Sequence, residues 1–130
     1  MSDHYAEVEW TNQTHSTQTD TYSRDHTVML ENGQIIENSA APSYLGNAKS
    51  SNPETLLLAA LASCHMLTFL ALCAVKGLIV KDYEDKAVGY LEKNLEGRMA
   101  MTRVRLHPFV VFEGESPDVE QLHMLHDRAH

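Results

Sequence analysis

One long apolar segment, residues 52–76, limits what this chain can fold into more than any other feature. It reads NPETLLLAALASCHMLTFLALCAVK, and its central part carries no formal charge at neutral pH. Asn52 is a good N-cap, Pro53 suits the first helical position, and Gly77 is a natural stop just after the segment. The pattern predicts a single long helix.

The apolar run at residues 56–75 is long enough to raise the question of a membrane span, since about 20 apolar residues can cross a bilayer. Its many alanines make it only moderately hydrophobic, His65 lies near its midpoint, and no aromatic belt marks its ends. We therefore expect no membrane contact. We expect a helix buried on most sides, in the core of a soluble domain or at a subunit interface.

Length and composition favour one globular domain over residues 1–130. Hydrophobic residues make up 43% of the chain and charged residues 22%, which are globular values. The net charge of −8 and the scattered basic residues exclude nucleic acid as the main partner, because phosphate binding needs clustered lysine and arginine. The N-terminal region holds no apolar signal segment, so secretion is not indicated.

The two cysteines, Cys64 and Cys73, lie in the same predicted helix. Nine residues of helix place them on opposite faces and about 13 Å apart along the axis. A disulfide needs Cα atoms within about 7 Å, so the pair cannot bridge inside an intact helix. The thiols are expected to be reduced, which indicates a cytoplasmic setting.

The region before the long helix is expected to form strands and loops. Residues 4–10 alternate and predict a strand, and Asn32-Gly33 predicts a hairpin turn. The other expected segments are a turn or loose edge at 11–21, strands at 22–31 and 34–38, and a loop at 41–51.

After the long helix we expect two long strands and a second helix. The strands cover residues 78–91 and 98–112, joined by a turn at 94–97, and Pro108 must mark an edge or a bulge. The second helix is expected to have Ser116 as its cap and Pro117 at its first position, and to run from Asp118 to the chain end. This order of elements predicts the α+β class.

Cys64 is either inert packing or a shielded nucleophile. A reactive thiol needs a lowered pKa, supplied by a helix N-terminus or a nearby cation. Cys64 lies more than two turns from the start of its helix, so a cation must come from elsewhere. His65 points about 100° away on the helix and is a poor base for Cys64. A core or interface histidine is the better interpretation of His65.

Two further features allow more than one interpretation. His123, His126 and His130 lie on one helical arc, which suits a metal site but equally suits a polar helix face. We favour the polar face and predict no metal and no cofactor. Glu54 is a first-turn carboxylate about 15 Å from Cys64 along the helix, so the two cannot meet within one chain unless the helix breaks. They could meet if two copies of the helix packed antiparallel in a dimer.

Several segments together resemble the OsmC/Ohr family (osmotically inducible protein C and organic hydroperoxide resistance protein), in its OsmC-like branch. They are NPETLLLAALASCHML, the upstream SRDH, DYEDKAVG, MTRVRLHP and the terminal LHMLHDRAH. The similarity covers residues 22–130, and its central motif has the spacing of the family.

The resemblance implies an OsmC-like fold, with antiparallel sheets around a long central buried helix, in an intertwined homodimer. It implies thiol-dependent reduction of organic hydroperoxides to alcohols, with an external dithiol of the lipoyl type as reductant. Cys64 matches the reactive cysteine, Arg24 the activating arginine and Glu54 the partnering carboxylate. Arg24 would favour the thiolate, and Glu54 would hold the guanidinium through a bidentate pair.

The chain departs from the family pattern at its end. Family peroxidases usually carry a resolving cysteine just after the terminal Ala-His step and a final strand, and this sequence ends at Ala129-His130. We expect that the C-terminal segment is lacking, or that turnover depends on an external thiol. A non-catalytic dimeric domain that binds a small hydrophobic ligand remains the alternative function, and a metal-binding module a more distant one.

Overall fold

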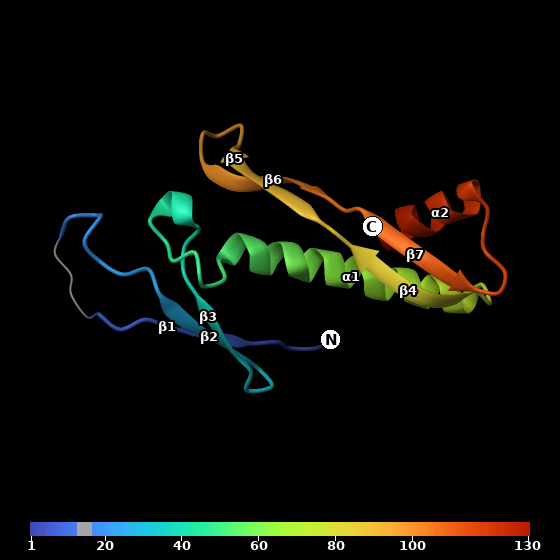
Figure 1. Ribbon diagram of the computed structural model, residues 1–130, viewed down its shortest axis with the longest axis horizontal. Helices are drawn as coiled ribbons and strands as arrows, with labels where there is room; N and C mark the ends of the chain where they lie inside the picture. Colours follow the sequence, from blue (N-terminus) through green and yellow to red (C-terminus); the bar gives the residue numbers. More distant parts are fainter. Residues whose placement is uncertain (13–16) are drawn as a thin grey trace. The chain divides into compact units, whose positions relative to one another are not determined.

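The computed structural model describes residues 1–12 and 17–130. The chain divides into two compact units, an N-terminal unit of residues 1–56 and a C-terminal unit of residues 57–130. Figure 1 labels their helices and strands along the chain. The expectation of a single domain over residues 1–130 stays a prediction.

The N-terminal unit contains a three-stranded antiparallel sheet in the order β1-β2-β3. The strands are β1 (Ala6–Glu9), β2 (His26–Leu30) and β3 (Ile35–Asn38). Because side chains alternate along a strand, one face presents Val28, which is buried, and the other presents the exposed Thr27. This confirms the strands predicted within residues 4–10 and 34–38.

The turn between β2 and β3 forms at Asn32-Gly33, as predicted. Gly33 has a φ of 89°, which suits glycine, and the Asn32 side chain accepts the backbone N–H of Gln34 at 3.1 Å. The strand predicted from residue 22 begins only at His26. Local hydrogen bonds hold the preceding residues instead, including one from the Asp25 N–H to the Ser23 hydroxyl at 3.1 Å. The loose segment predicted at 11–21 includes residues 13–16, which lie outside the described residues.

The loop predicted at 41–51 is tightly built. It contains the short 3-10 helix η1 (Pro42–Tyr44), followed by Leu45 in the left-handed region with a φ of 63°. Gly46 then passes so close to the preceding chain that a Cβ there would lie 1.6 Å from the Ala40 carbonyl oxygen. The Ser39 hydroxyl accepts the backbone N–H of Asn47 at 3.1 Å and closes the loop.

The long helix α1 (Pro53–Val75) forms as the sequence predicts. The Asn52 side chain accepts the N–H of Thr55 at 2.9 Å, and Gly77 ends the helix with a φ of 75°.

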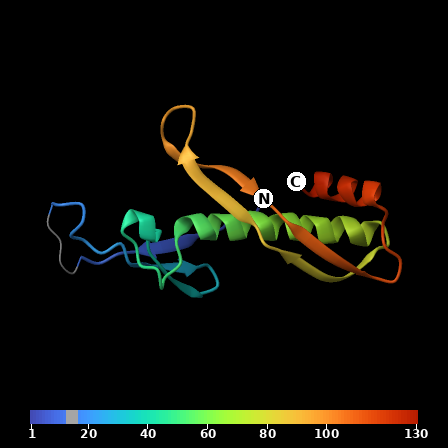
Figure 2. The same cartoon turned by 45° about the horizontal axis from the view of Figure 1, so that its top comes forward.

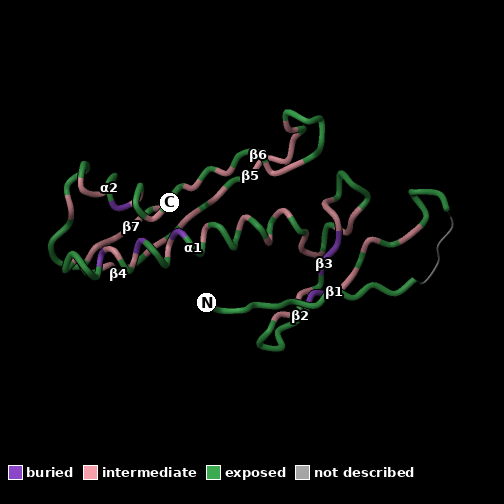
Figure 3. Tube along the Cα trace, turned by 180° about the vertical axis from the view of Figure 1, so that it is seen from behind, coloured by how far each residue is buried: buried purple, intermediate pink, exposed green. Residues whose placement is uncertain are grey.

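Most of the surface of α1 is uncovered in the single chain, as the green and pink stretches in Figure 3 show. His65, Phe69 and Cys73 are its buried residues. Burial on most sides is therefore not reached within one chain. Among the described residues, α1 is the one helix long and apolar enough to cross a membrane, judged by length and composition alone. A helix that packs in a core or an interface passes the same test.

Four strands follow α1 and form one bent hairpin. They are β4 (Ile79–Asp85), β5 (Val88–Lys93), β6 (Met99–Arg105) and β7 (Pro108–Glu113). β4 pairs with β7 and β5 pairs with β6, both antiparallel, and Figure 2 shows the β5–β6 end projecting away from α1.

The prediction of two long strands at 78–91 and 98–112 is wrong, because each segment is interrupted in the middle. The breaks lie opposite each other, and the hydrogen bonds there explain them. The His107 N–H donates to the Asp85 carboxylate at 2.7 Å, and the His107 ring bonds the Lys86 carbonyl at 3.1 Å. Pro108, which has no N–H to donate, starts the new strand at this bend, where an edge or a bulge within one strand was expected.

The second helix, α2 (Val119–Ala129), packs on the C-terminal half of α1. Its cap is Asp118, not Ser116, because the Asp118 carboxylate accepts the Gln121 N–H at 2.8 Å. Phe69, Cys73 and Leu125 form the buried centre of this unit. The observed order β-β-β-α-β-β-β-β-α keeps the predicted α+β class.

Candidate functional site

Cys64 is exposed on α1 and lines a pocket of about 200 Å³ in the C-terminal unit. The other lining residues lie on α1, on β6 and just after it, and at the end of α2, and they are mainly apolar: Leu61, His65, Val104, Leu106, Ala129 and His130. The predicted nucleophile is therefore accessible from an apolar hollow and is not packed in the core.

Cys73 has the opposite environment. It is 1% exposed in the core between α1 and α2, and its burial raises the pKa of its thiol. Both cysteines are free, as their predicted spacing requires. Of the two thiols, Cys64 is the one that solvent and small molecules can reach.

His65 is buried and pairs with His126 of α2. Its Nε2 lies 3.0 Å from Nδ1 of His126, and the two rings are stacked with an angle of 4° between their planes. Burial lowers the pKa of both imidazoles, so both favour the neutral form. This agrees with the interpretation of His65 as a core or interface histidine.

A second hollow of about 360 Å³ adjoins the Cys64 pocket and shares four of its walls, His65, Val104, Leu106 and His130. Pattern reasoning did not assign Val104 and Leu106 to a site. The sequence does hold a signal for these two residues, because the alternation along residues 98–112 places Val104 and Leu106 on one face. What the sequence does not reveal is that this face lies over Cys64.

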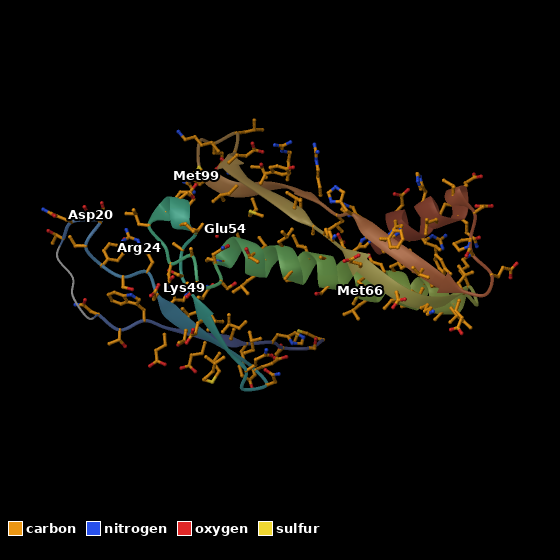
Figure 4. The ribbon with its side chains drawn as sticks, in the orientation of Figure 1. Asp20, Arg24, Lys49, Glu54, Met66 and Met99 are labelled. Atoms are coloured by element: carbon orange, nitrogen blue, oxygen red, sulfur yellow. The ribbon has the colours of Figure 1, made fainter. Side chains whose placement is uncertain are left out.

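Arg24 belongs to the N-terminal unit and lies just before β2, as Figure 4 shows. Its guanidinium carbon lies 4.0 Å from the centre of the Tyr22 ring. Its nitrogens donate to the carbonyls of Tyr22, at 2.8 Å, and of Thr19. It also lines a mainly apolar hollow of about 380 Å³ with Val8, Trp10, Tyr22, Ser23 and His26.

Glu54 lies in the first turn of α1, at the helix end labelled in Figure 4. Its Oε2 is buried and has no hydrogen-bond partner among the described residues. A buried carboxylate oxygen without a donor is costly, so Glu54 is suited to receive a cation or an N–H group. Arg24 and Glu54 fall in the N-terminal unit and Cys64 in the C-terminal unit, so their meeting stays a prediction.

The C-terminal histidines do not converge. In the part of the chain that the structure describes, no group of three histidine, cysteine or acidic residues is placed to hold a metal ion. His126 instead turns toward His65, while His123 is exposed. The geometry thus gives the metal-binding alternative no support.

Comparison with known proteins shows which family this chain resembles. The model of the OsmC-like protein family matches residues 46–130. An OsmC-like protein of unknown function from Vibrio cholerae is 40% identical, with a TM-score of 0.92, over 100% of this chain and 88% of that one. No match is found among curated proteins.

Two organic hydroperoxide resistance proteins share the fold at lower identity. OsmC from Legionella pneumophila is 17% identical, with a TM-score of 0.72, over 99% of this chain and 82% of that one. OhrB from Bacillus subtilis is 18% identical, with a TM-score of 0.60, over 96% and 82%. On the family match and the Vibrio cholerae likeness, this chain belongs to the OsmC-like protein family.

Proposed function

We propose that this protein reduces organic hydroperoxides to alcohols, with Cys64 as the reactive thiol. Family membership supports this, as do the hydroperoxide resistance proteins among the structures that share the fold. The observation that carries the proposal is the contrast between an exposed Cys64 in an apolar pocket and a buried Cys73. An apolar pocket favours a hydrophobic hydroperoxide over hydrogen peroxide.

In the proposed reaction, the Cys64 thiolate attacks the distal oxygen of R–O–OH. The O–O bond breaks, a sulfenic acid forms on Cys64, and the alkoxide takes up a proton to leave as the alcohol. One thiol of a reductant then condenses with the sulfenic acid and releases water. A second thiol of the same reductant breaks the mixed disulfide and restores Cys64.

Arg24 and Glu54 would activate the thiol. A guanidinium beside Cys64 favours the thiolate and the negative charge that develops on the leaving oxygen. Glu54 would orient that guanidinium through two parallel hydrogen bonds, which its unpartnered Oε2 is free to accept. Because Glu54 and Cys64 are about 15 Å apart on one helix, we assign this Glu54 to a second copy of the chain.

The uncovered face of α1 supports a homodimer. Leu57, Leu61 and Leu67 are 46%, 44% and 62% exposed, and Cys64 lies among them. Their helical spacing forms one apolar stripe, the α1 stripe. Packing two α1 stripes together would bury the helix on most sides and bring two copies of the site to the interface.

The reductant would be an external dithiol of the lipoyl type. Cys73 is on the opposite face of the same helix and is buried, so it is unsuited to resolve the sulfenic acid. The small OsmC-like fold suggests a soluble protein, and we place it in the cytoplasm, where free thiols stay reduced.

The direct test is peroxide consumption by the purified protein, with cumene hydroperoxide as substrate and dihydrolipoamide as reductant. Cys64→Ser should abolish turnover, while the matched variant Cys73→Ser should retain it. Arg24→Ala should lower kcat/KM by about a hundredfold, and Arg98→Ala, at an exposed turn arginine, should not. Equal, slow consumption by wild type and Cys64→Ser would refute the proposal.

One observation favours a second function, the binding of a small hydrophobic ligand without catalysis. The residues that line the Cys64 pocket include no lysine or arginine, which suits an uncharged apolar molecule. Under this alternative, wild type and Cys64→Ser would bind an apolar fluorescent probe equally well, and neither would consume peroxide.

A further inference from the structure

Burial alternates along residues 21–26, the segment that leads into β2 and carries Arg24. Tyr22, Arg24 and His26 are half-buried, whereas the residues between them are exposed. Tyr22 and His26 thus lie on the covered side of the segment together with Arg24, which Figure 4 labels. All three also line the mainly apolar hollow of about 380 Å³. The proposed reaction uses the side chain of Arg24 and assigns no part to Tyr22 or His26.

Ring hydrogen bonds hold the backbone at Arg24 in place. Trp10, just after β1, donates from its ring Nε1 to the Ser23 carbonyl at 2.9 Å. His26 donates from Nδ1 to the carbonyl of Arg24 at 2.8 Å. The Nε2 of His26 lies 3.0 Å from Nδ2 of Asn38, a residue of β3 that is 2% exposed. The backbone that carries the Arg24 side chain is therefore tied to the end of β1 and to a buried residue of β3.

The side chain of Arg24 is held by the tyrosine two positions earlier. Its guanidinium carbon lies 4.0 Å from the centre of the Tyr22 ring, well within the distance of a cation–π contact. Its nitrogens donate to the Tyr22 carbonyl, at 2.8 Å, and to the Thr19 carbonyl. One face of the guanidinium thus lies on an aromatic ring, while two backbone carbonyls align its edge.

This arrangement leaves donors for the proposed chemistry. A guanidinium has five N–H groups, and the bonds to Thr19 and Tyr22 use one on each terminal nitrogen. Among the described residues, the remaining N–H groups suffice for a bidentate pair with a carboxylate such as Glu54 and for one bond to an oxyanion. The stacking contact uses no donor, because it acts through the face of the guanidinium. The ring of Tyr22 can therefore restrict the orientation of Arg24 without competing for these hydrogen bonds.

A guanidinium of fixed orientation activates a thiol more effectively than a mobile one. A free arginine side chain has many rotamers, and ordering it beside a thiolate costs conformational entropy. Stacking on a ring orders the side chain before the thiolate arrives. We propose that Tyr22 is a positioning residue, whose ring keeps Arg24 in the orientation in which it activates Cys64. This inference rests on the proposed function, in which Arg24 supplies the cation.

Two readouts test the proposal on the full chain. They are the pH dependence of Cys64 alkylation by iodoacetamide, with the modified peptide identified by mass spectrometry, and kcat/KM for cumene hydroperoxide. Tyr22→Leu removes the ring and should raise the pH of half-maximal alkylation by about half a unit and lower kcat/KM about two- to fivefold. Tyr22→Phe keeps a ring face and should match wild type in both readouts. The matched control is Tyr5→Leu, at a 73% exposed tyrosine of the same unit, which should also match wild type.

A double variant separates positioning from a general effect on the fold. In an Arg24→Ala background, Tyr22→Leu should change neither readout further, because no guanidinium remains to be positioned. A further loss in that background, a loss in Tyr22→Phe equal to that in Tyr22→Leu, or a wild-type profile for Tyr22→Leu would overturn the proposal. A wild-type alkylation profile for Arg24→Ala would overturn it as well.

Failure of this proposal and failure of the proposed function are separable. Alkylation needs no peroxide, so it reports on Tyr22 whether or not the protein consumes cumene hydroperoxide. Equal, slow consumption by wild type and Cys64→Ser would refute the proposed function. The alkylation profiles of Tyr22→Leu and Tyr22→Phe would still decide whether the ring positions Arg24.

Discussion

The hydrogen bond between Nε2 of His65 and Nδ1 of His126, 3.0 Å long, ties α2 to the middle of α1. The His126 ring also stacks on Phe69, with 4.2 Å between ring centres. The pKa of His126 is lowered chiefly by burial and further by the charges of His65 and His123, while Asp85 and Asp127 act in the opposite direction. The pKa of His65 is lowered by burial and by the charge of His130, whereas the charge of Asp85 acts to raise it. Two neutral imidazoles thus lie at the contact between α1 and α2.

The first prediction is that the protein loses stability as the pH falls below about 6.5, the ordinary histidine pKa. The folded pair resists protonation while the unfolded chain accepts protons, so acid favours unfolding. Above that pH the contribution of the pair is fully present. Urea unfolding between about pH 5 and 8 measures the slope of the unfolding free energy with pH.

His126→Gln removes one titrating group and should give a shallower slope than wild type. The matched control is Met124→Gln, at an exposed position of the same helix, which changes no titrating group and should keep the wild-type slope. A wild-type slope no steeper than that of His126→Gln would show that this imidazole is not held neutral in the fold.

The elements of the fold that local chemistry determines were predictable from the sequence. The Asn52 cap, the apolar run and Gly77 fix α1, and Asn32-Gly33 fixes the hairpin between β2 and β3. The breaks in the two long strands were not predictable in this way, because they depend on His107 bonding Asp85 and Lys86 across the hairpin. Sequence alternation continues through both breaks and does not reveal them.

The candidate site was predictable only in part. The family motif leads to Cys64 as the predicted nucleophile, and the helical geometry places Glu54 of the same chain about 15 Å away. The partner of His65 was not foreseen, because it lies on α2, sixty-one residues further along the chain.

The second prediction concerns the reactivity of the two thiols. Iodoacetamide should modify Cys64 in the folded protein and leave Cys73 unmodified, because Cys73 is buried and its pKa is raised. Mass spectrometry of peptides, with and without urea, identifies the modified residue. Cys64→Ser is the control and should remain unlabelled until it is unfolded. Labelling of native Cys64→Ser at the wild-type rate would contradict the burial of Cys73.

The third prediction concerns Gly46. Alanine there would place its Cβ 1.6 Å from the Ala40 carbonyl oxygen, so the loop before α1 must shift. We expect Gly46→Ala to cost about 3 kcal/mol in unfolding free energy, as overpacking does. Gly77→Ala is the matched control, because a Cβ there meets nothing within 4 Å. Its only cost is the backbone strain of an alanine at a φ of 75°. That strain costs about 1 kcal/mol. Urea unfolding gives both values, and an equal or smaller loss for Gly46→Ala would contradict the close approach.

The fourth prediction tests the α1 stripe as the dimer interface. Leu67 is 62% exposed in the single chain, so Leu67→Asp should leave the fold of one copy intact. In a dimer built on this stripe, the carboxylate would be buried without a partner, and the dimer dissociation constant should rise by about tenfold or more. Sedimentation velocity at several concentrations measures that constant, while circular dichroism checks the helix content. The control is Lys81→Asp, at an exposed position of β4 away from the stripe, which should sediment like wild type. If Leu67→Asp keeps its helices and still sediments like wild type, the α1 stripe is not the interface and Glu54 of a second copy must reach Cys64 by another route.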